Sequence, residues 1–171
     1  MTPQDAIVRI GQSTAQEGFT TYDDSLNGLR VLVARTSQFR FRWVATKLHT
    51  FLVATVFPPG TATPDQLDGF MQAALGYAQA HKGGLPVGLQ TGLAAISVAV
   101  TEYTDPAAQS WAATPHGRKF GMLTFPVLLD VTTGAVTRPP RLVVGGVYSG
   151  YLKGIVAKHV VAAVGGRLTN G

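Results

Sequence analysis

The chain has 171 residues, of which 46% are hydrophobic and only 13% are charged, and it contains no cysteine. This composition excludes an intrinsically disordered chain, which needs low hydrophobicity and high charge. The missing cysteines exclude disulfides, thiolate catalysis and cysteine-based zinc sites. The length is typical of one domain, so we expect a single α+β domain over residues 1–171 with a mobile carboxyl end.

Charged residues are unevenly distributed within the formal net charge of +5. Five basic residues and no acid lie between Arg30 and Lys47, and after Pro106 the only acid is Asp130. The bases of this second region are Arg118, Lys119, Arg138, Arg141, Lys153, Lys158 and Arg167. Such stretches suit an anionic partner. The sequence favours another interpretation, in which basic residues on the wet side of strands discourage pairing between sheet edges.

The first predicted element is a helix that begins at Thr2-Pro3, where a capping side chain precedes a proline. Residues 19–57 then show a period of two and are rich in β-branched and aromatic side chains, which indicates a sheet. A strand at Leu29–Thr36 is expected to pair with Phe19–Tyr22 ahead of it.

The middle of the chain continues the sheet and then turns helical. Residues 38–57 are too long for one typical strand, so we divide them near residues 46–49 into two strands of an antiparallel meander. Residues 64–82 predict a long helix, because Thr63 precedes Pro64 as a cap and apolar residues recur on one face. We assign that apolar face to the core.

A glycine-rich segment follows this helix and is uncharged from residue 83 to residue 92. It does not qualify as a phosphate-binding loop, since such a loop follows a strand and opens a helix, whereas this one follows a helix and opens a strand. Its glycines allow close approach of the backbone to a ligand. Gly84, Gly88 and Gln90 are therefore candidate ligand-binding residues, with ordinary turn geometry as the competing interpretation.

The next segments predict a central apolar strand at Leu93–Tyr103 and a helix that starts at Asp105-Pro106. The loop after that helix carries His116, Arg118 and Lys119. The two cations suit a phosphate or carboxylate, and the imidazole suits an acid or a base. These three residues are candidate ligand-binding residues, and a solvated turn is the alternative.

The last third of the chain predicts a hairpin and a closing helix. Residues 120–130 and 135–144 form the hairpin around Gly134, which can adopt positive φ. Pro126 lacks a ladder donor and marks an edge or a bulge. Residues 148–164 place apolar side chains on one helical face, although their many β-branched residues leave a strand open for residues 154–164.

This order of elements predicts an α+β fold, with a mostly antiparallel sheet (a meander plus a carboxyl-terminal hairpin) and helices packed mainly on one face. At the level of architecture only, it resembles small dimeric chaperone-like α+β domains, which is an analogy of fold. A chain so poor in charge often hides apolar surface in a subunit interface, and a two-fold dimer is the commonest outcome. The expected function is that of a non-catalytic, self-associating binding or assembly domain. The alternative is an enzyme or ligand-binding protein for a small anionic ligand at the His116, Arg118 and Lys119 loop.

Other partners and groups find little support in the sequence. No cofactor or metal is predicted, because the four histidines share no ligand spacing. The aromatic rings and arginines of residues 39–43 fall on opposite faces of a strand, whereas single-stranded nucleic acid needs both on one surface, so nucleic acid is not an expected partner. No transmembrane or secretory segment is visible, and we expect a cytoplasmic location by default.

Overall fold

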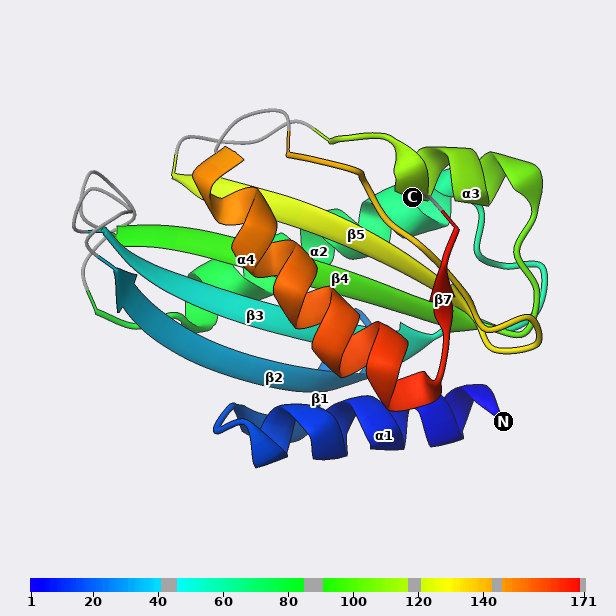
Figure 1. Cartoon of the computed structure of the whole chain (residues 1–171), viewed down its shortest axis with the longest axis horizontal. Helices are drawn as coiled ribbons and strands as arrows, with labels where there is room; N and C mark the ends of the chain where they lie inside the picture. Colours follow the sequence, from blue (N-terminus) through cyan, green and yellow to red (C-terminus); the bar gives the residue numbers. More distant parts are fainter. Residues whose placement is uncertain (41–45, 85–90, 117–120, 143–145, 170–171) are drawn as a thin grey trace.

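A computed structural model describes residues 1–40, 46–84, 91–116, 121–142 and 146–169. Its strands form one seven-stranded sheet in chain order, from β1 at one edge to β7 at the other, and Figure 1 shows the central strands β2 to β5 side by side. The strands are β1 Thr20–Leu26, β2 Leu29–Arg40, β3 Thr46–Val56, β4 Thr91–Thr101, β5 Met122–Asp130, β6 Ala135–Thr137 and β7 Arg167–Leu168. Residues 170–171, in the end that we expect to be mobile, lie outside the described ranges.

The sheet is mixed, which corrects the mostly antiparallel prediction. β1, β2 and β3 form the predicted antiparallel meander, but β4 runs parallel to β3, and β5 runs parallel to β4. The physical reason is that helix α2 (Pro64–His81) and helix α3 (Pro106–Ala113) separate these strands. A helix carries the chain back across the sheet, so the next strand enters in the same direction.

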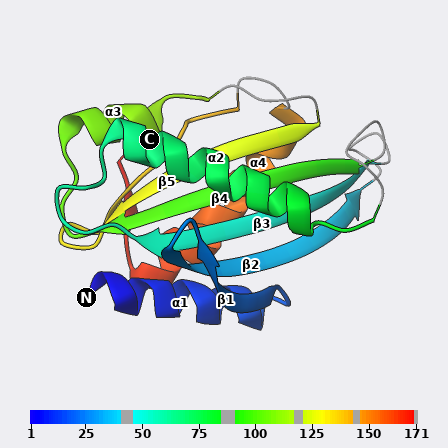
Figure 2. The same ribbon diagram turned by 180° about the vertical axis from the view of Figure 1, so that it is seen from behind.

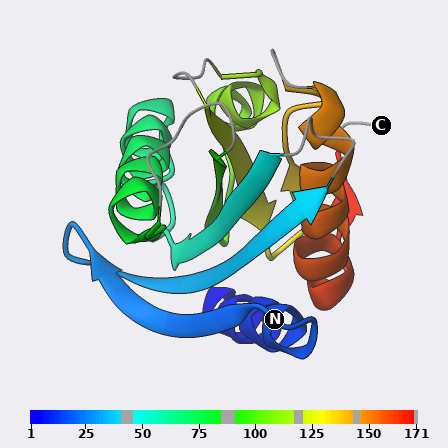
Figure 3. The same cartoon turned by 90° about the vertical axis from the view of Figure 1, so that its left-hand side faces the viewer.

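Helices cover both faces of the sheet, not mainly one (Figures 2 and 3). α2 and α3 pack on one face, where they share a core with residues such as Val33 and Phe51. Helix α1 (Pro3–Gln16) and helix α4 (Gly146–Val156) pack on the other, around residues such as Leu52 and Phe125. Every residue of β4 is buried, as expected of a parallel strand covered on both sides.

The three predicted helix starts are confirmed by their caps. Thr2 and Asp5 form a capping box at the start of α1. The Thr63 side chain accepts a hydrogen bond from the amide of Gln66, and the Asp105 carboxylate accepts one from the amide of Ala108. These caps satisfy amides that have no partner within the helix.

The closing segment is helical, as predicted, and its strand alternative is wrong. α4 continues into η2, a stretch of π-helix at Ala157–Ala162 that buries His159 and Val160. A π-helical insertion of this kind shifts the side chains that follow it around the helix axis.

The predicted hairpin is present, but its second arm is much shorter than expected. Gly134 adopts a φ of 69° in the turn, and β6 covers only Ala135–Thr137 of the predicted residues 135–144. Pro139 and Pro140 come shortly after β6 in the chain, and neither has an amide N–H that could extend the strand pairing. Because β6 pairs with β5 only through Leu128–Asp130, Pro126 lies where β5 has no β6 partner, which confirms the prediction of an edge.

The first meander has one strand fewer than predicted among the described residues. β2 runs without a break through Leu29–Arg40, so the strand predicted at Leu29–Thr36 and the first strand predicted within residues 38–57 are one strand. β3 begins at Thr46, close to the predicted division at 46–49, and residues 41–45 lie outside the described ranges. Within the described ranges, no helix combines the length and the apolar character needed to cross a bilayer.

Candidate functional site

A polar pocket of about 400 Å³ lies at one end of the sheet, on the face covered by α2. We call it the basic pocket. Its described lining residues are Gly18, Thr20, Arg35, Thr36, Ser37, Lys47, His49, Phe51 and Lys82. They come from the start of β1, the second half of β2, the first half of β3 and the residue that follows α2.

The pocket lies where the strands extend beyond the end of the helix that covers them. The 18 residues of α2 span about 27 Å at helical rise, whereas the 12 residues of β2 span about 40 Å as a strand. Figure 2 shows α2 ending before the ends of β2 and β3. Ser37 follows the buried side of β2 but is itself exposed, and His49 beside it on β3 is 9% exposed.

Three cations surround the pocket, and none of its described lining residues is acidic. Arg35 donates a hydrogen bond from Nη1 to the carbonyl oxygen of His81 at 3.2 Å, and Lys82 donates from Nζ to the carbonyl oxygen of Gly83 at 3.2 Å. A guanidinium carries five N–H donors, so the contact with His81 orients Arg35 and leaves donors for a ligand. Lys47 is exposed at the start of β3.

His49 and Ser37 form the inner polar surface of the pocket. Oγ of Ser37 lies 2.7 Å from Nδ1 of His49, and the two share a hydrogen bond. His49 is 9% exposed. Burial lowers the pKa of His49 below its usual value, and the positive charges of Lys47, Lys82 and Arg35 lower that pKa further. The imidazole is therefore neutral at physiological pH.

The last turn of α2, which holds Arg35, is itself tied to the first hairpin. Oη of Tyr77 donates to the carboxylate of Asp24 at 2.5 Å and lies 3.2 Å from Oη of Tyr22. The ring of His81 stacks on the ring of Tyr77 at 3.9 Å between centroids. The hydrogen bond from Tyr77 lowers the pKa of Asp24, so the carboxylate stays charged. This network fixes the helix end beside the pocket.

The structure joins two features that the sequence shows separately. Arg35 and Lys47 belong to the acid-free run that begins at Arg30, and Lys82 opens the glycine-rich segment. Of the predicted residues in that segment, Gly84 lies two residues after Lys82 with a φ of 67°. The predicted Gly88 and Gln90 lie outside the described residues.

The predicted histidine loop is described only in part. Nε2 of His116 donates to the carbonyl oxygen of Trp111 at 2.9 Å, and the His116 ring lies 4.3 Å from the Trp111 ring between centroids. His116 thus folds back on the end of α3. Arg118 and Lys119 lie outside the described residues, so the arrangement predicted for this trio stays a prediction.

Sequence reasoning missed the Ser37–His49 pair. The two residues are separated by 12 positions and come together because they face each other across β2 and β3. Alternation along each strand places them on a defined face, but it does not define the register between strands. The only signal in the sequence was that Ser37 lies within the basic run and that His49 follows it by two residues.

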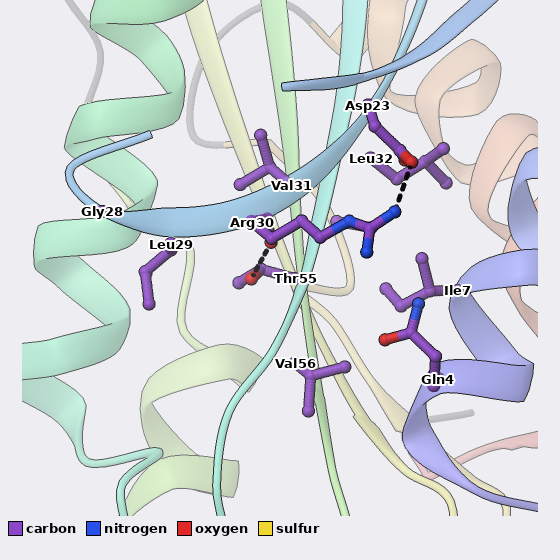
Figure 4. Close-up of a pocket in the computed structure, with 11 residues that line it drawn as sticks. Gln4, Ile7, Asp23, Gly28, Leu29, Arg30, Val31, Leu32, Thr55 and Val56 are labelled. Atoms are coloured by element: carbon purple, nitrogen blue, oxygen red, sulfur yellow. Dashed lines mark hydrogen bonds and ion pairs between the residues drawn. The ribbon is translucent and has the colours of Figure 1, made fainter. Parts of the chain in front are cut away.

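A second pocket, of about 190 Å³, lies between the start of α1, the start of β2 and the end of β3 (Figure 4). Its charged groups satisfy each other, since Nη2 of Arg30 lies 2.8 Å from Oδ2 of Asp23. The hydroxyl of Thr55 donates to the carbonyl oxygen of Arg30 at 2.8 Å. Most of the remaining wall is apolar, from residues such as Ile7 and Val31, and we assign this pocket to packing.

A third pocket, of about 390 Å³, lies on the opposite face of the sheet beside η2. The buried His159 shares a hydrogen bond of 2.9 Å with Oγ of Ser13 and lies edge-on to Phe19. Its exposed charges form an ion pair, with Nζ of Lys158 lying 2.7 Å from the carboxylate of Glu17. A broad polar groove between α1 and η2 continues from it past Arg9. The described lining residues of the third pocket therefore carry no excess of one charge, unlike those of the basic pocket.

In the described part of the chain, no three metal-binding side chains come together. No protein-family model matches the chain, and no match was found among curated proteins or among solved structures.

Proposed function

We propose that the protein is a non-catalytic binding domain for a small anionic ligand, which it holds in the basic pocket. The observation that carries the proposal is the convergence of Arg35, Lys47 and Lys82 around a pocket with no acid among its described lining residues. Like charges in such proximity repel one another, and a bound anion relieves that repulsion. A volume of about 400 Å³ suits a small molecule.

Binding fits the site better than catalysis does. Ser37 and His49 have the residue types of a nucleophile and a base, but a general base must accept a proton and become an imidazolium. The three surrounding cations disfavour that charge, and none of the described lining residues is a carboxylate that would stabilise it. His49 is therefore suited to donating or accepting a hydrogen bond as a neutral ring.

The proposal is tested by titrating the full chain with inorganic phosphate and with citrate at low ionic strength, using calorimetry and amide chemical shifts. We expect Lys47→Ala to weaken binding about tenfold or more. Arg167→Ala is the matched control, because it removes one exposed positive charge at β7, the other edge of the sheet. Equal effects of the two variants, or no binding of either anion at millimolar concentration, would contradict the proposal.

Two further expectations from the sequence remain proposals beside this one. We expect the protein to form a homodimer in the cytoplasm. Its large, exposed apolar side chains are spread over α1, β2, the segment after β4 and α4, and they do not single out one surface as the interface. Anion binding at the His116, Arg118 and Lys119 loop is the alternative site, and the phosphate titration of an Arg118→Ala variant tests it separately.

A further inference from the structure

The three positive charges around the basic pocket favour a ligand that carries more than one negative charge. Three cations line it from three different elements, β2, β3 and the end of α2. A carboxylate or a phosphodiester brings one negative charge, whereas a phosphate monoester brings nearly two at neutral pH and presents three terminal oxygens. Arginine matches such an oxygen array with its planar fork, and lysine adds point charges beside it.

The neutral groups of the pocket complete a site for a phosphate. When the hydroxyl of Ser37 donates to Nδ1 of His49, the ring proton lies on Nε2, and the imidazole becomes a neutral hydrogen-bond donor. Their distance of 2.7 Å supports this strong mutual contact. A neutral donor adds to the binding of an oxyanion without adding to the repulsion among the cations.

The inner wall of the pocket favours the end of a molecule over the middle of a chain. That wall includes Phe51, which is 1% exposed, and His49, which is 9% exposed. A phosphodiester in a nucleic acid continues on both sides of the phosphorus, whereas a monoester ends in its phosphate. A group that enters from one side and stops at a buried wall is therefore a terminal one.

From these observations we propose that the basic pocket binds the terminal, doubly charged phosphate of a phosphate monoester. The inference rests on the proposed function and narrows its ligand class. The monoester can belong to a small free molecule or to the headgroup of a lipid, since both present the same phosphate.

The experiment compares four probes on the full chain at pH 7.5 and low ionic strength: methyl phosphate, dimethyl phosphate, acetate and sulfate. We expect methyl phosphate to bind at least about tenfold more tightly than the two monoanions, and sulfate, which is also doubly charged, to lie close to methyl phosphate. Lys47→Ala should abolish most of this preference, and Arg167→Ala should leave it unchanged.

A pH series separates the charge of the ligand from the titration of the protein. The second ionisation of a phosphate monoester has a pKa of about 6, whereas sulfate keeps its charge. Protonation of His49 affects both ligands alike. We therefore expect the affinity ratio of methyl phosphate to sulfate to fall severalfold between pH 7.5 and pH 5.0, and a constant ratio would overturn the inference.

The remaining outcomes distinguish this inference from the proposed function. If acetate or dimethyl phosphate binds as tightly as methyl phosphate, the monoester inference fails while the anion site stands. If none of the four probes binds, both fail.

A vesicle experiment identifies the source of the monoester. It compares binding to phosphatidylcholine vesicles with and without phosphatidic acid. Binding that requires phosphatidic acid and is lost in Lys47→Ala assigns the monoester to a lipid headgroup. Methyl phosphate binding without vesicle binding assigns it to a free molecule.

Discussion

Ser37 of β2 and His49 of β3 stand directly opposite each other in the sheet, and Oγ of Ser37 lies 2.7 Å from Nδ1 of His49. The same register places Arg35 opposite Phe51, and Phe39 opposite Lys47. The two cations thus flank the Ser37–His49 pair diagonally, one on each strand. One antiparallel register assembles most of the basic pocket, and the end of α2 adds Lys82.

The first prediction concerns the serine hydroxyl. Ser37→Ala removes the partner of Nδ1 of His49, so the ring should populate both neutral tautomers, whereas the unchanged protein should hold one. Ring nitrogen chemical shifts measure this directly. Because Ser37 is exposed, the variant should lose only about 1 kcal/mol of stability or less, and anion affinity should fall severalfold. A single, unchanged tautomer in the variant would show that Ser37 does not orient the ring.

The second prediction is a loss of stability in mild acid. Burial lowers the pKa of both His49 and His159 in the folded state, so unfolding binds protons when the pH falls below the ordinary histidine value. The contribution of these two histidines to the free energy of unfolding is fully present above about pH 6.5. It is lost as the pH falls from there through their pKa values in the folded state, by at most about 1.4 kcal/mol per pH unit for each ring. Urea unfolding from pH 7.5 to pH 5 measures the slope. His159→Asn should flatten it, and an equally steep slope in that variant would exclude His159 as a source.

The third prediction contrasts two glycines. A Cβ at position 166 would lie 2.8 Å from the carbonyl oxygen of Gly134, whereas a Cβ at Gly69, within α2, meets nothing within 4 Å. Gly166→Ala should therefore destabilise the protein by about 1–3 kcal/mol, as overpacking does. Gly69→Ala should stabilise it by about 0.5–1 kcal/mol through helix propensity. The midpoints of thermal unfolding of the two variants should shift in opposite directions. An unchanged midpoint in Gly166→Ala would show that the turn at Gly134 moves to accommodate the added methyl group without loss of stability.

The fourth prediction is the homodimer expected from the sequence. Light scattering at micromolar concentration should give twice the chain mass of 18.0 kDa. A mass of one chain would contradict the dimer and would leave the anion-binding proposal untouched, since all described lining residues of the basic pocket come from one chain.

The sequence by itself determined the local elements of this protein. Thr63 and Asp105 predict helix starts because each places a side-chain oxygen before a proline. That oxygen accepts a hydrogen bond from an unpaired amide in the first helical turn, only three residues away. The period of two across residues 19–57 likewise indicated strands, although it placed a break within β2 that the structure does not have. Such signals act over short distances along the chain, so they can be recognised without knowing the fold.

Only the tertiary structure decided the strand directions, the two covered faces and the site. Whether β4 lies parallel to β3 depends on how α2 crosses the sheet. The contact between Ser37 and His49 depends on the register between β2 and β3, which the alternation of side chains along each strand does not define. Lys82 joins Arg35 because α2 ends before the strands do, and no local pattern encodes that difference in length. The basic run was visible as charge along the chain, and folding turned part of it into a pocket by placing distant residues side by side.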